Sequence, residues 1–187
     1  MSNYEFLLAK HECLETERLF LRPVKMKDAE DVFEYTSDEE TTRFLYEPHT
    51  ELQQAEKMIG NYFMKEPLGK YALVVKETGK MIGAIEFRID SWNKSGDLGF
   101  TLNRHFWGNG YMTEAGKAVL HMAFTILQLE RVHAAHDVKN PMSGNVLLRL
   151  GMTREGTLRK SEMIRGTLVD SAYYSILKDE YNESKNR

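Results

Sequence analysis

Two glycines near the middle of the chain are the residues best suited to chemistry. Gly108 and Gly110 lie in the segment His-Phe-Trp-Gly-Asn-Gly-Tyr-Met-Thr-Glu-Ala (105–115), between an apolar run at 98–102 and the strongest helical pattern of the sequence. Because neither has a Cβ, the backbone can approach a ligand closely at both positions. The first N–H groups of the following helix would point at an anion from the positive end of the helix dipole. The segment therefore predicts a phosphate-bearing cofactor bound near residues 108–113.

The glycine spacing differs from two familiar phosphate-binding loops. A dinucleotide-binding fingerprint has a third glycine where this chain has Thr113, and the Gly-Lys-Ser/Thr of a nucleoside-triphosphate loop does not occur in the segment. Taken by itself, the segment is also compatible with an ordinary tight turn before a helix. The rest of the chain must decide between these interpretations.

The elements that must hold this turn follow from the hydrophobic pattern. Strands are expected at 16–24, 70–76, 81–89, 97–102, 131–138, 155–164 and 168–178, and helices at 28–36, 38–44, 50–64, 113–128 and 140–150. The charged tail after Glu180 is expected to be frayed. This order predicts the α/β (α+β) class, with a mostly antiparallel meander that feeds one parallel strand pair.

Local signals support several of the helix limits. Asn140 followed by Pro141 is typical of a helix start, and Gly151 of a helix stop. The segment Thr-Glu-Leu-Gln (50–53) matches a capping box. Glu114 lies in the first turn of the helix after the glycines, where a carboxylate favours the helix dipole, so a structural role is expected for it.

Composition limits the classes of function. The chain has 187 residues, 42% hydrophobic and 28% charged, with a net charge of −3. These values predict a single domain over residues 1–187, with its core at about 16–181. No apolar run is long enough to cross a membrane. The slight negative charge argues against nucleic-acid binding through a broad basic surface and mildly favours amine-bearing partners.

The cysteine and histidine content argues against a metal site and for a reducing compartment. Cys13 is the only cysteine, which excludes an internal disulfide and a cysteine zinc site and predicts a cytoplasmic location. His133 and His136 lie in one predicted strand and project to opposite faces. No metal site is therefore expected.

Five motifs in register resemble the GNAT superfamily of acetyl-CoA-dependent N-acetyltransferases. They lie at 107–115, 140–144, 150–152, 154–156 and 170–175, in the order found in the branch of ribosomal-protein-alanine acetyltransferases, the Rim-type branch. The resemblance implies a mostly antiparallel central sheet with helices on both faces and a splayed parallel strand pair at the cofactor site. Trp107 and Met112 depart from the family signature Arg/Gln-x-x-Gly-x-Gly/Ala. Met112 must point away from the phosphates if it is not to narrow the cradle.

The resemblance implies acetyl-CoA as cofactor and attack of a free amine on its thioester. The residues expected to bind acetyl-CoA are Phe100, Thr101, Leu102, Trp107, Gly108, Asn109, Gly110, Tyr111, Met112, Thr113, Asn140, Ser143 and Asn145. The strand residues would pair with the pantetheine arm, and the turn would hold the pyrophosphate.

The resemblance also implies two catalytic residues. Many relatives carry a Tyr seven residues after the capping Asn, where this chain has Leu147, so Ser143 is expected to donate to the leaving thiolate. A structural role at the helix start is the alternative for Ser143. Glu162 matches the acidic residue assigned as the base, with Glu86, Asp97 or a water chain as alternatives.

The acceptor is the least determined part of the prediction. The resemblance favours the N-terminal α-amine of a protein, and a small-molecule amine such as a polyamine, an aminoglycoside or an amino-acid-like compound is the alternative. Phe44, Leu45, Tyr46 and Trp92 are candidates to line its pocket. A non-catalytic acyl-CoA sensor of the same fold and a nucleotide-dependent oxidoreductase are the rival functions. A homodimer is also left open.

Overall fold

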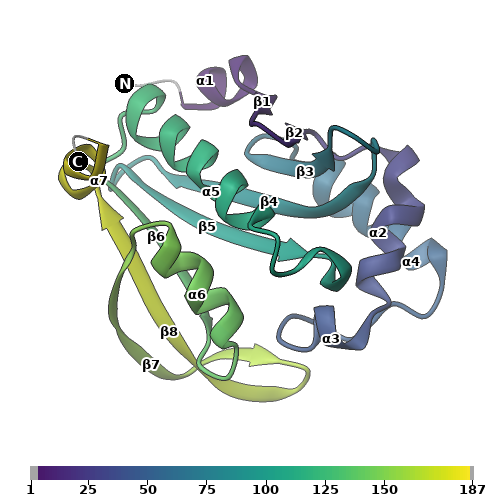
Figure 1. The fold of residues 1–187 in the computed structure, drawn as a ribbon. Coiled ribbons are helices and arrows are strands. Elements are labelled where there is room, and N and C mark those ends of the chain that lie inside the picture. The colour runs from purple at the N-terminus through teal and green to yellow at the C-terminus, as the bar shows by residue number, and fades with distance from the viewer. Residues whose placement is uncertain (1–3, 186–187) are drawn as a thin grey trace.

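The computed structural model describes residues 4–185 and has one eight-stranded sheet with helices on both faces (Figure 1). The strand order is β1-β2-β3-β4-β5-β6-β8-β7, and β5–β6 is the parallel pair among antiparallel neighbours. The strands are β1 (Leu14–Glu15), β2 (Leu19–Arg22), β3 (Lys70–Val75), β4 (Met81–Asp90), β5 (Ser95–Leu102), β6 (Arg131–Asp137), β7 (Thr153–Ile164) and β8 (Thr167–Leu177). The predicted fold class and the single parallel pair are confirmed.

Helices divide between the two faces of the sheet. They are α1 (Tyr4–Lys10), α2 (Ala29–Thr36), α3 (Glu39–Thr42), α4 (Leu52–Met58), α5 (Tyr111–His121), α6 (Pro141–Arg149) and α7 (Lys178–Lys185), with short 3-10 turns η1 (Met26–Asp28) and η3 (Arg104–Phe106) and π segments η2 (Ile59–Met64) and η4 (Met122–Ile126). Buried residues of α5 and of α2 and α4 belong to two separate core clusters. Figure 1 shows α5 and α6 side by side over one face, with α2, α3 and α4 at the other end of the sheet.

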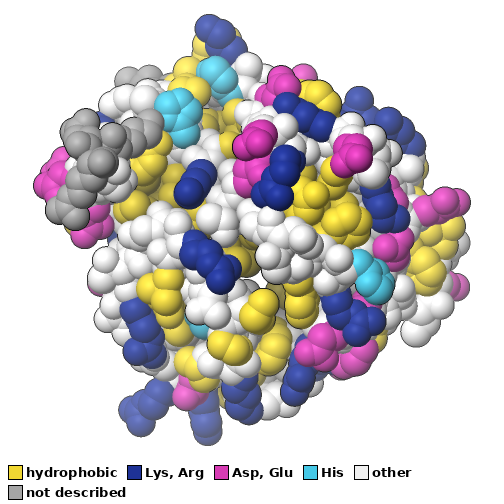
Figure 2. All heavy atoms as spheres, in the orientation of Figure 1, with side chains coloured by type: hydrophobic (Ala, Val, Ile, Leu, Met, Phe, Trp, Pro, Cys, Tyr) yellow, Lys and Arg dark blue, Asp and Glu magenta, His cyan; other side chains and the backbone are white. Residues whose placement is uncertain are grey.

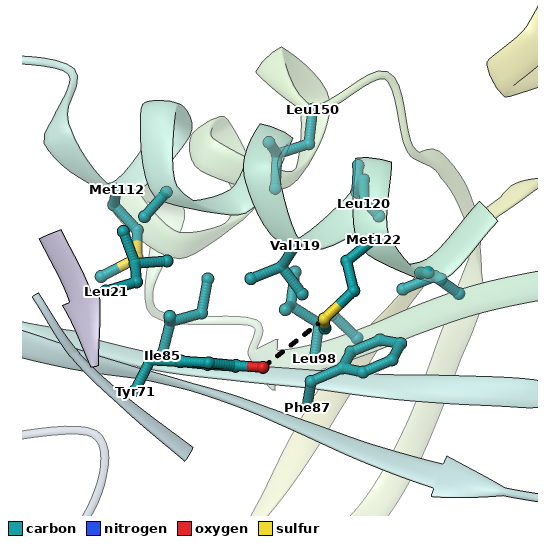
Figure 3. Close-up of a cluster of buried hydrophobic side chains, with 14 of the residues drawn as sticks. Leu21, Tyr71, Ile85, Phe87, Leu98, Met112, Val119, Leu120, Met122 and Leu150 are labelled. Carbon is teal, nitrogen blue, oxygen red and sulfur yellow. Dashed lines mark hydrogen bonds between the residues drawn. The ribbon is translucent and has the colours of Figure 1, made fainter. Parts of the chain in front are cut away.

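The larger core cluster holds the helix after the glycine turn against the sheet (Figure 3). Val119 and Met122 pack with Tyr71, whose hydroxyl lies 3.5 Å from the Met122 sulfur. Gly116 allows α5 to touch α6, because a Cβ there would come within 2.7 Å of Leu150. The apolar face of α5 is therefore core, and the two helices are fixed relative to each other.

The segments near both limits of residues 4–185 are more ordered than the sequence predicts. Tyr4 and Leu8 of α1 are buried in the larger core, outside the predicted range 16–181. The tail predicted to be frayed forms α7, because Tyr181 is buried and stacks on Phe124 with ring centroids 4.9 Å apart. These tertiary contacts outweigh the high charge of the tail.

The ends of several strands and helices differ from the predicted ends. The strand predicted at 16–24 is shortened to β2, and Thr16 instead donates its hydroxyl to Leu19 O and to Glu114. The capping glutamine of α4 is Gln54 rather than Gln53, since its Oε1 accepts from the backbone of Thr50 and Glu51. The predicted capping box therefore lies one residue too early in the sequence.

The parallel pair is short, and this positions the site. Only Ser95–Arg131, Gly96–Val132 and Asp97–His133 are paired between β5 and β6. β5 continues to Leu102 along β4, and β6 continues to Asp137 along β8. The two strands therefore separate after Asp97 and His133, as expected for the splayed pair.

Candidate active site

The separated part of β5 presents backbone groups without a neighbouring strand. Asn103 N donates to Ile82 O of β4 at 2.8 Å. Because alternate residues of an antiparallel pair turn both backbone groups to the partner, Thr101 faces β4, whereas Phe100 and Leu102 face the gap. Two of the three strand residues predicted to pair with pantetheine are thus oriented to do so.

Trp107 ties the glycine turn to the end of this strand. Its indole N–H donates to Leu102 O at 2.7 Å. The Leu102 carbonyl is thereby satisfied, which leaves the Leu102 N–H and both groups of Phe100 for a ligand. Trp107, at the signature position usually taken by Arg or Gln, therefore braces the cradle in this structure.

The turn before α5 has the geometry of an anion cradle. Gly108 and Gly110 have φ of +77° and +80°, the left-handed region that side chains disfavour. The first helical hydrogen bond runs from Glu114 N to Gly110 O at 3.0 Å. The N–H groups of residues 111–113 precede it and have no carbonyl in the helix to donate to. Asn109 Nδ2 closes the turn by donating to Trp107 O at 3.0 Å.

Met112 does not obstruct this cradle. Its side chain is buried and points toward Leu21 and the sheet in Figure 3. The expectation that Met112 points away from the phosphates is confirmed. The residues of the turn therefore fit a pyrophosphate held by backbone N–H groups.

Arg18 is a residue of the cradle that sequence reasoning missed. Its guanidinium donates to Asn109 O at 3.0 Å, pairs with Glu114 at 2.7 Å and lies 4.4 Å from the centroid of the Tyr111 ring. Glu114 also accepts from Thr16 Oγ1 and Arg18 N, which confirms its structural role. Arg18 lies some 90 positions from the turn in sequence, so no local pattern connects them.

Ser143, the predicted thiolate donor, lies in the first turn of α6. Asn140 Oδ1 accepts from Ser143 N at 3.2 Å, and Asn140 Nδ2 donates to Ser143 Oγ at 3.0 Å. Since Asn140 already caps the helix, the Ser143 hydroxyl is not needed for capping. Its oxygen is held as an acceptor, which leaves its own proton free to donate elsewhere. Figure 2 shows a hollow between the turn before α5 and this first turn of α6.

Two other residues of α6 face elsewhere. Leu147 is buried beneath the helix at 1% exposure. Asn145 lines a hollow of about 230 Å³ between α6 and the β6–β8 strands, together with His136 and Arg154. Its predicted contact with the cofactor phosphates would have to be made from that side.

Two carboxylates lie beside the separated strands. Glu86 of β4 pairs in register with Gly99, two residues beyond the last parallel pair. Its Oε2 accepts a hydrogen bond from Tyr62 OH and lies 3.9 Å from Arg88. Asp97 is more exposed and pairs with Arg88 at 3.0 Å. Arg88 therefore bridges the two acids.

Glu162 is placed differently from these two. It lies on β7, opposite Val169, and is exposed, and among residues 4–185 it has neither a hydrogen-bond nor an ion-pair partner. The cross-strand register turns it to the face shared by Val169 and Ser171. Its predicted role as the base remains a prediction.

The tip of the β7–β8 hairpin is anchored to the α3 region. Arg165 donates from Nε to Tyr46 O at 3.0 Å, and its other nitrogens reach Thr42 Oγ1 at 3.0 Å and Glu39 at 2.5 Å. Burial, and to a smaller extent the charge of Glu86, raise the pKa of Tyr46 to about 12. Tyr46 is therefore brought toward Glu86 by the hairpin anchor, whereas Trp92 lies at the opposite end of β5 from Leu102.

Within residues 4–185, no group of three or more His, Cys, Asp and Glu is arranged to hold a metal ion. The helices of that same range are all too short or too polar to span a bilayer.

Comparison with known proteins identifies the family. Residues 18–153 match the model of the acetyltransferase (GNAT) domain. An uncharacterized N-acetyltransferase p20 of Bacillus licheniformis is 35% identical over 175 residues, which cover 91% of this chain and 98% of that protein. The ribosomal-protein-serine acetyltransferase of Escherichia coli is 32% identical over 111 residues, 59% of this chain and 62% of that protein. A GNAT-family acetyltransferase from Bacillus anthracis superposes with a TM-score of 0.81 at 26% identity, covering 89% of this chain and 99% of that one. With the cradle, the splayed strands and these matches together, the chain belongs to the GNAT family of acetyl-CoA-dependent N-acetyltransferases.

Proposed function

We propose that this enzyme transfers the acetyl group of acetyl-CoA to the N-terminal α-amine of a protein. The observation that carries the proposal is the position of Glu86, a half-buried carboxylate beside the separated strands, where an amine would meet the thioester. The similarity to a ribosomal-protein-serine acetyltransferase supports a protein acceptor.

The residues present divide the work of binding between two elements. The backbone N–H groups of residues 110–113 and the dipole of α5 would hold the pyrophosphate. The outward-facing backbone groups of Phe100 and the N–H of Leu102 would hold the pantetheine arm as a further strand. When bound, acetyl-CoA supplies an activated acyl group and a thiolate leaving group.

Glu86 is the side chain best placed to take the amine proton. Oε2 accepts from Tyr62, and Oε1 has no hydrogen-bond partner in the described part of the chain. An amine whose proton passes to Oε1 can form the new N–C bond as the C–S bond breaks. The Ser143 hydroxyl, free to donate, would then stabilise the departing sulfur.

An acceptor panel tests the proposal. Release of the CoA thiol would be measured with peptides bearing a free N-terminus, the same peptides with a blocked N-terminus, polyamines and aminoglycosides. The expected result is turnover with free peptides that disappears when the N-terminus is blocked. Turnover confined to polyamines or aminoglycosides would assign a small-molecule acceptor instead. Binding of acetyl-CoA without turnover across the panel would argue for a sensor.

A further inference from the structure

Tyr62 is delivered to Glu86 by an irregular helical segment. α4 continues into the π segment η2, where Ile59 and Phe63 are buried against the sheet and Tyr62 is 39% exposed. A π segment inserts an extra residue into the helical turn and changes the direction of the side chains after it. The Tyr62 ring packs edge-on against Phe63 with centroids 5.1 Å apart. The ring is therefore fixed on one side by the core.

Lys70 fixes the same ring from the other side. Its ammonium lies 3.8 Å from the centroid of the Tyr62 ring and donates to Tyr62 O at 2.7 Å. Lys70 is also the cross-strand partner of Glu86 in the β3–β4 register, and it is 8% exposed. The phenol is thus held by a cation–π contact and a backbone contact, so its hydroxyl has little freedom to leave Glu86.

The hydroxyl acts as a hydrogen-bond donor rather than as an acid. Burial and the hydrogen bond to the Glu86 carboxylate both raise the pKa of Tyr62 above its ordinary value. Tyr62 therefore keeps its proton throughout the working pH range and can donate it to the Glu86 carboxylate. A charge-assisted hydrogen bond of this kind holds the carboxylate in a fixed direction.

The position directly opposite Glu86 on β5 carries no side chain. Gly99, directly opposite Glu86, has no side chain, and a Cβ there would lie 3.6 Å from Arg88. The titratable and charged groups that face Glu86 are Tyr35 of α2, Tyr46 after α3, Tyr62 of η2, Lys70 of β3, Arg88 of β4 and Asp97 of β5. Of these, Tyr62 is the one that donates a hydrogen bond to the carboxylate.

We propose that Tyr62 is a positioning residue that holds the Glu86 carboxylate turned toward the acceptor amine. The inference rests on the proposed role of Glu86 as the base. It adds a second element, the irregular end of α4, to the machinery of proton removal. Tyr62 itself does not touch the reacting atoms in this proposal.

The test replaces Tyr62 with Phe, which keeps the ring for Phe63 and Lys70 and removes only the hydroxyl. Tyr71→Phe is the matched control, because that hydroxyl donates to His11 O on the opposite face of the sheet. Two readouts are needed. The first is the NMR chemical shift of the Glu86 carboxyl carbon at neutral pH, which reports on its hydrogen bond and is assigned through Glu86→Gln. The second is the pH profile of kcat/KM for the acceptor.

In Tyr62→Phe the Glu86 carboxyl signal is expected to shift, because the carboxylate loses its hydrogen-bond donor. kcat/KM near neutral pH should fall about tenfold, with acetyl-CoA affinity changed less than twofold, and the loss should shrink at high pH, where the amine is already neutral. An unmoved carboxyl signal and a wild-type profile would overturn the inference. If Glu86→Gln itself retains a wild-type profile, the base assignment fails instead, and the carboxyl signal still decides whether Tyr62 holds the carboxylate.

Discussion

Arg165 at the tip of the β7–β8 hairpin donates from Nε to the backbone oxygen of Tyr46, 119 residues earlier, at 3.0 Å. The contact joins the last hairpin to the loop after α3, which Figure 1 shows lying beside the hairpin tip. Arg165 adopts φ of +46°, which is unusual for a residue other than glycine. The anchor therefore holds both the hairpin and the Tyr46 loop in place near Glu86.

Arg165→Ala should weaken the use of acceptor more than the binding of cofactor. Loss of contacts to Tyr46, Thr42 and Glu39 frees the loop, so the KM for the acceptor should rise about tenfold, as for one well-formed charged hydrogen bond. Arg43→Ala, which removes an exposed ion pair with Glu40, is the control and should behave like wild type. Equal losses in acceptor KM and acetyl-CoA affinity would show that the anchor is only a general support of the fold.

Gly110→Val should weaken acetyl-CoA binding more than tenfold, at least ~1.4 kcal/mol. The residue has φ of +80° at the N-terminus of α5, so a branched side chain would force the cradle to rearrange. Gly79→Val is matched for backbone strain, with φ of +70° and open space around it, but lies in the turn between β3 and β4. Calorimetry on both folded variants measures the effect. Unchanged affinity in Gly110→Val would show that this turn does not bind the pyrophosphate of acetyl-CoA.

Ser143→Ala should lower kcat about tenfold or more and leave the KM for acetyl-CoA within twofold, because a donor to the thiolate acts mainly in the transition state. Asn140 continues to cap α6 in this variant, so the melting temperature should hardly change. Ser37→Ala, at the end of α2, is the control serine. A lower melting temperature with intact kcat would make Ser143 a structural residue.

Leu147→Tyr is not expected to restore a thiolate donor to the Ser143→Ala variant. Leu147 is buried in the core, so Leu147→Tyr would overpack it. The position that carries a donor in many relatives is thus unsuited to one in this chain, which is consistent with the assignment of the donor to Ser143.

Glu114→Gln should destabilise the fold by ~1–3 kcal/mol near pH 7. Burial raises the pKa of Glu114, but the hydrogen bonds from Thr16 and Arg18 outweigh it, and the net pKa is lower than in an unfolded chain. A depressed acid pKa stabilises the native state above the unfolded pKa, and that stability is lost as the pH falls through the folded pKa. The difference between variant and wild type should therefore narrow below about pH 4.5.

Denaturant unfolding as a function of pH measures this difference. Glu15→Gln is the control, since Glu15 pairs with Lys76 at the surface. A Glu114 variant as stable as wild type at pH 7 would mean that the Arg18 contact contributes nothing to the cradle's support.

The sequence predicts the site best where its chemistry is local. The glycine turn, the Asn140 cap and the apolar face of α5 each depend on residues within one or two turns, and all three occur in the structure. The order of strands follows as well, because the hairpin turns and the short parallel pair leave few alternatives.

Contacts between distant segments were beyond prediction from one sequence. Arg18 reaches the cradle from the turn between β1 and β2, and Arg165 reaches Tyr46 from the last hairpin. Neither is marked by spacing or composition. The same limit applies to the base, which stays a prediction. The resemblance favours Glu162, whereas the proposal of Glu86 depends on Tyr62, placed by an irregular helix end.

Three substitutions of a carboxylate by the corresponding amide distinguish the candidates for the base. Glu86→Gln, Glu162→Gln and Asp97→Asn each keep volume and remove the ability to accept a proton. Since Glu86 lies beside the separated strands and Glu162 is exposed on β7, the largest loss is expected for Glu86→Gln. Wild-type profiles in all three would mean that the enzyme works mainly by holding cofactor and amine together.

The measurement that tests the account most directly is the pH dependence of acceptor-driven thiol release in wild type and Glu86→Gln. An α-amine with a pKa of about 8 is mostly protonated at pH 7 and mostly neutral at pH 9. The account predicts that Glu86→Gln loses about a hundredfold or more in kcat/KM at pH 7 and recovers most of it by pH 9. A Glu86→Gln profile that superimposes on wild type would contradict the account, as would a loss that is the same at both pH values.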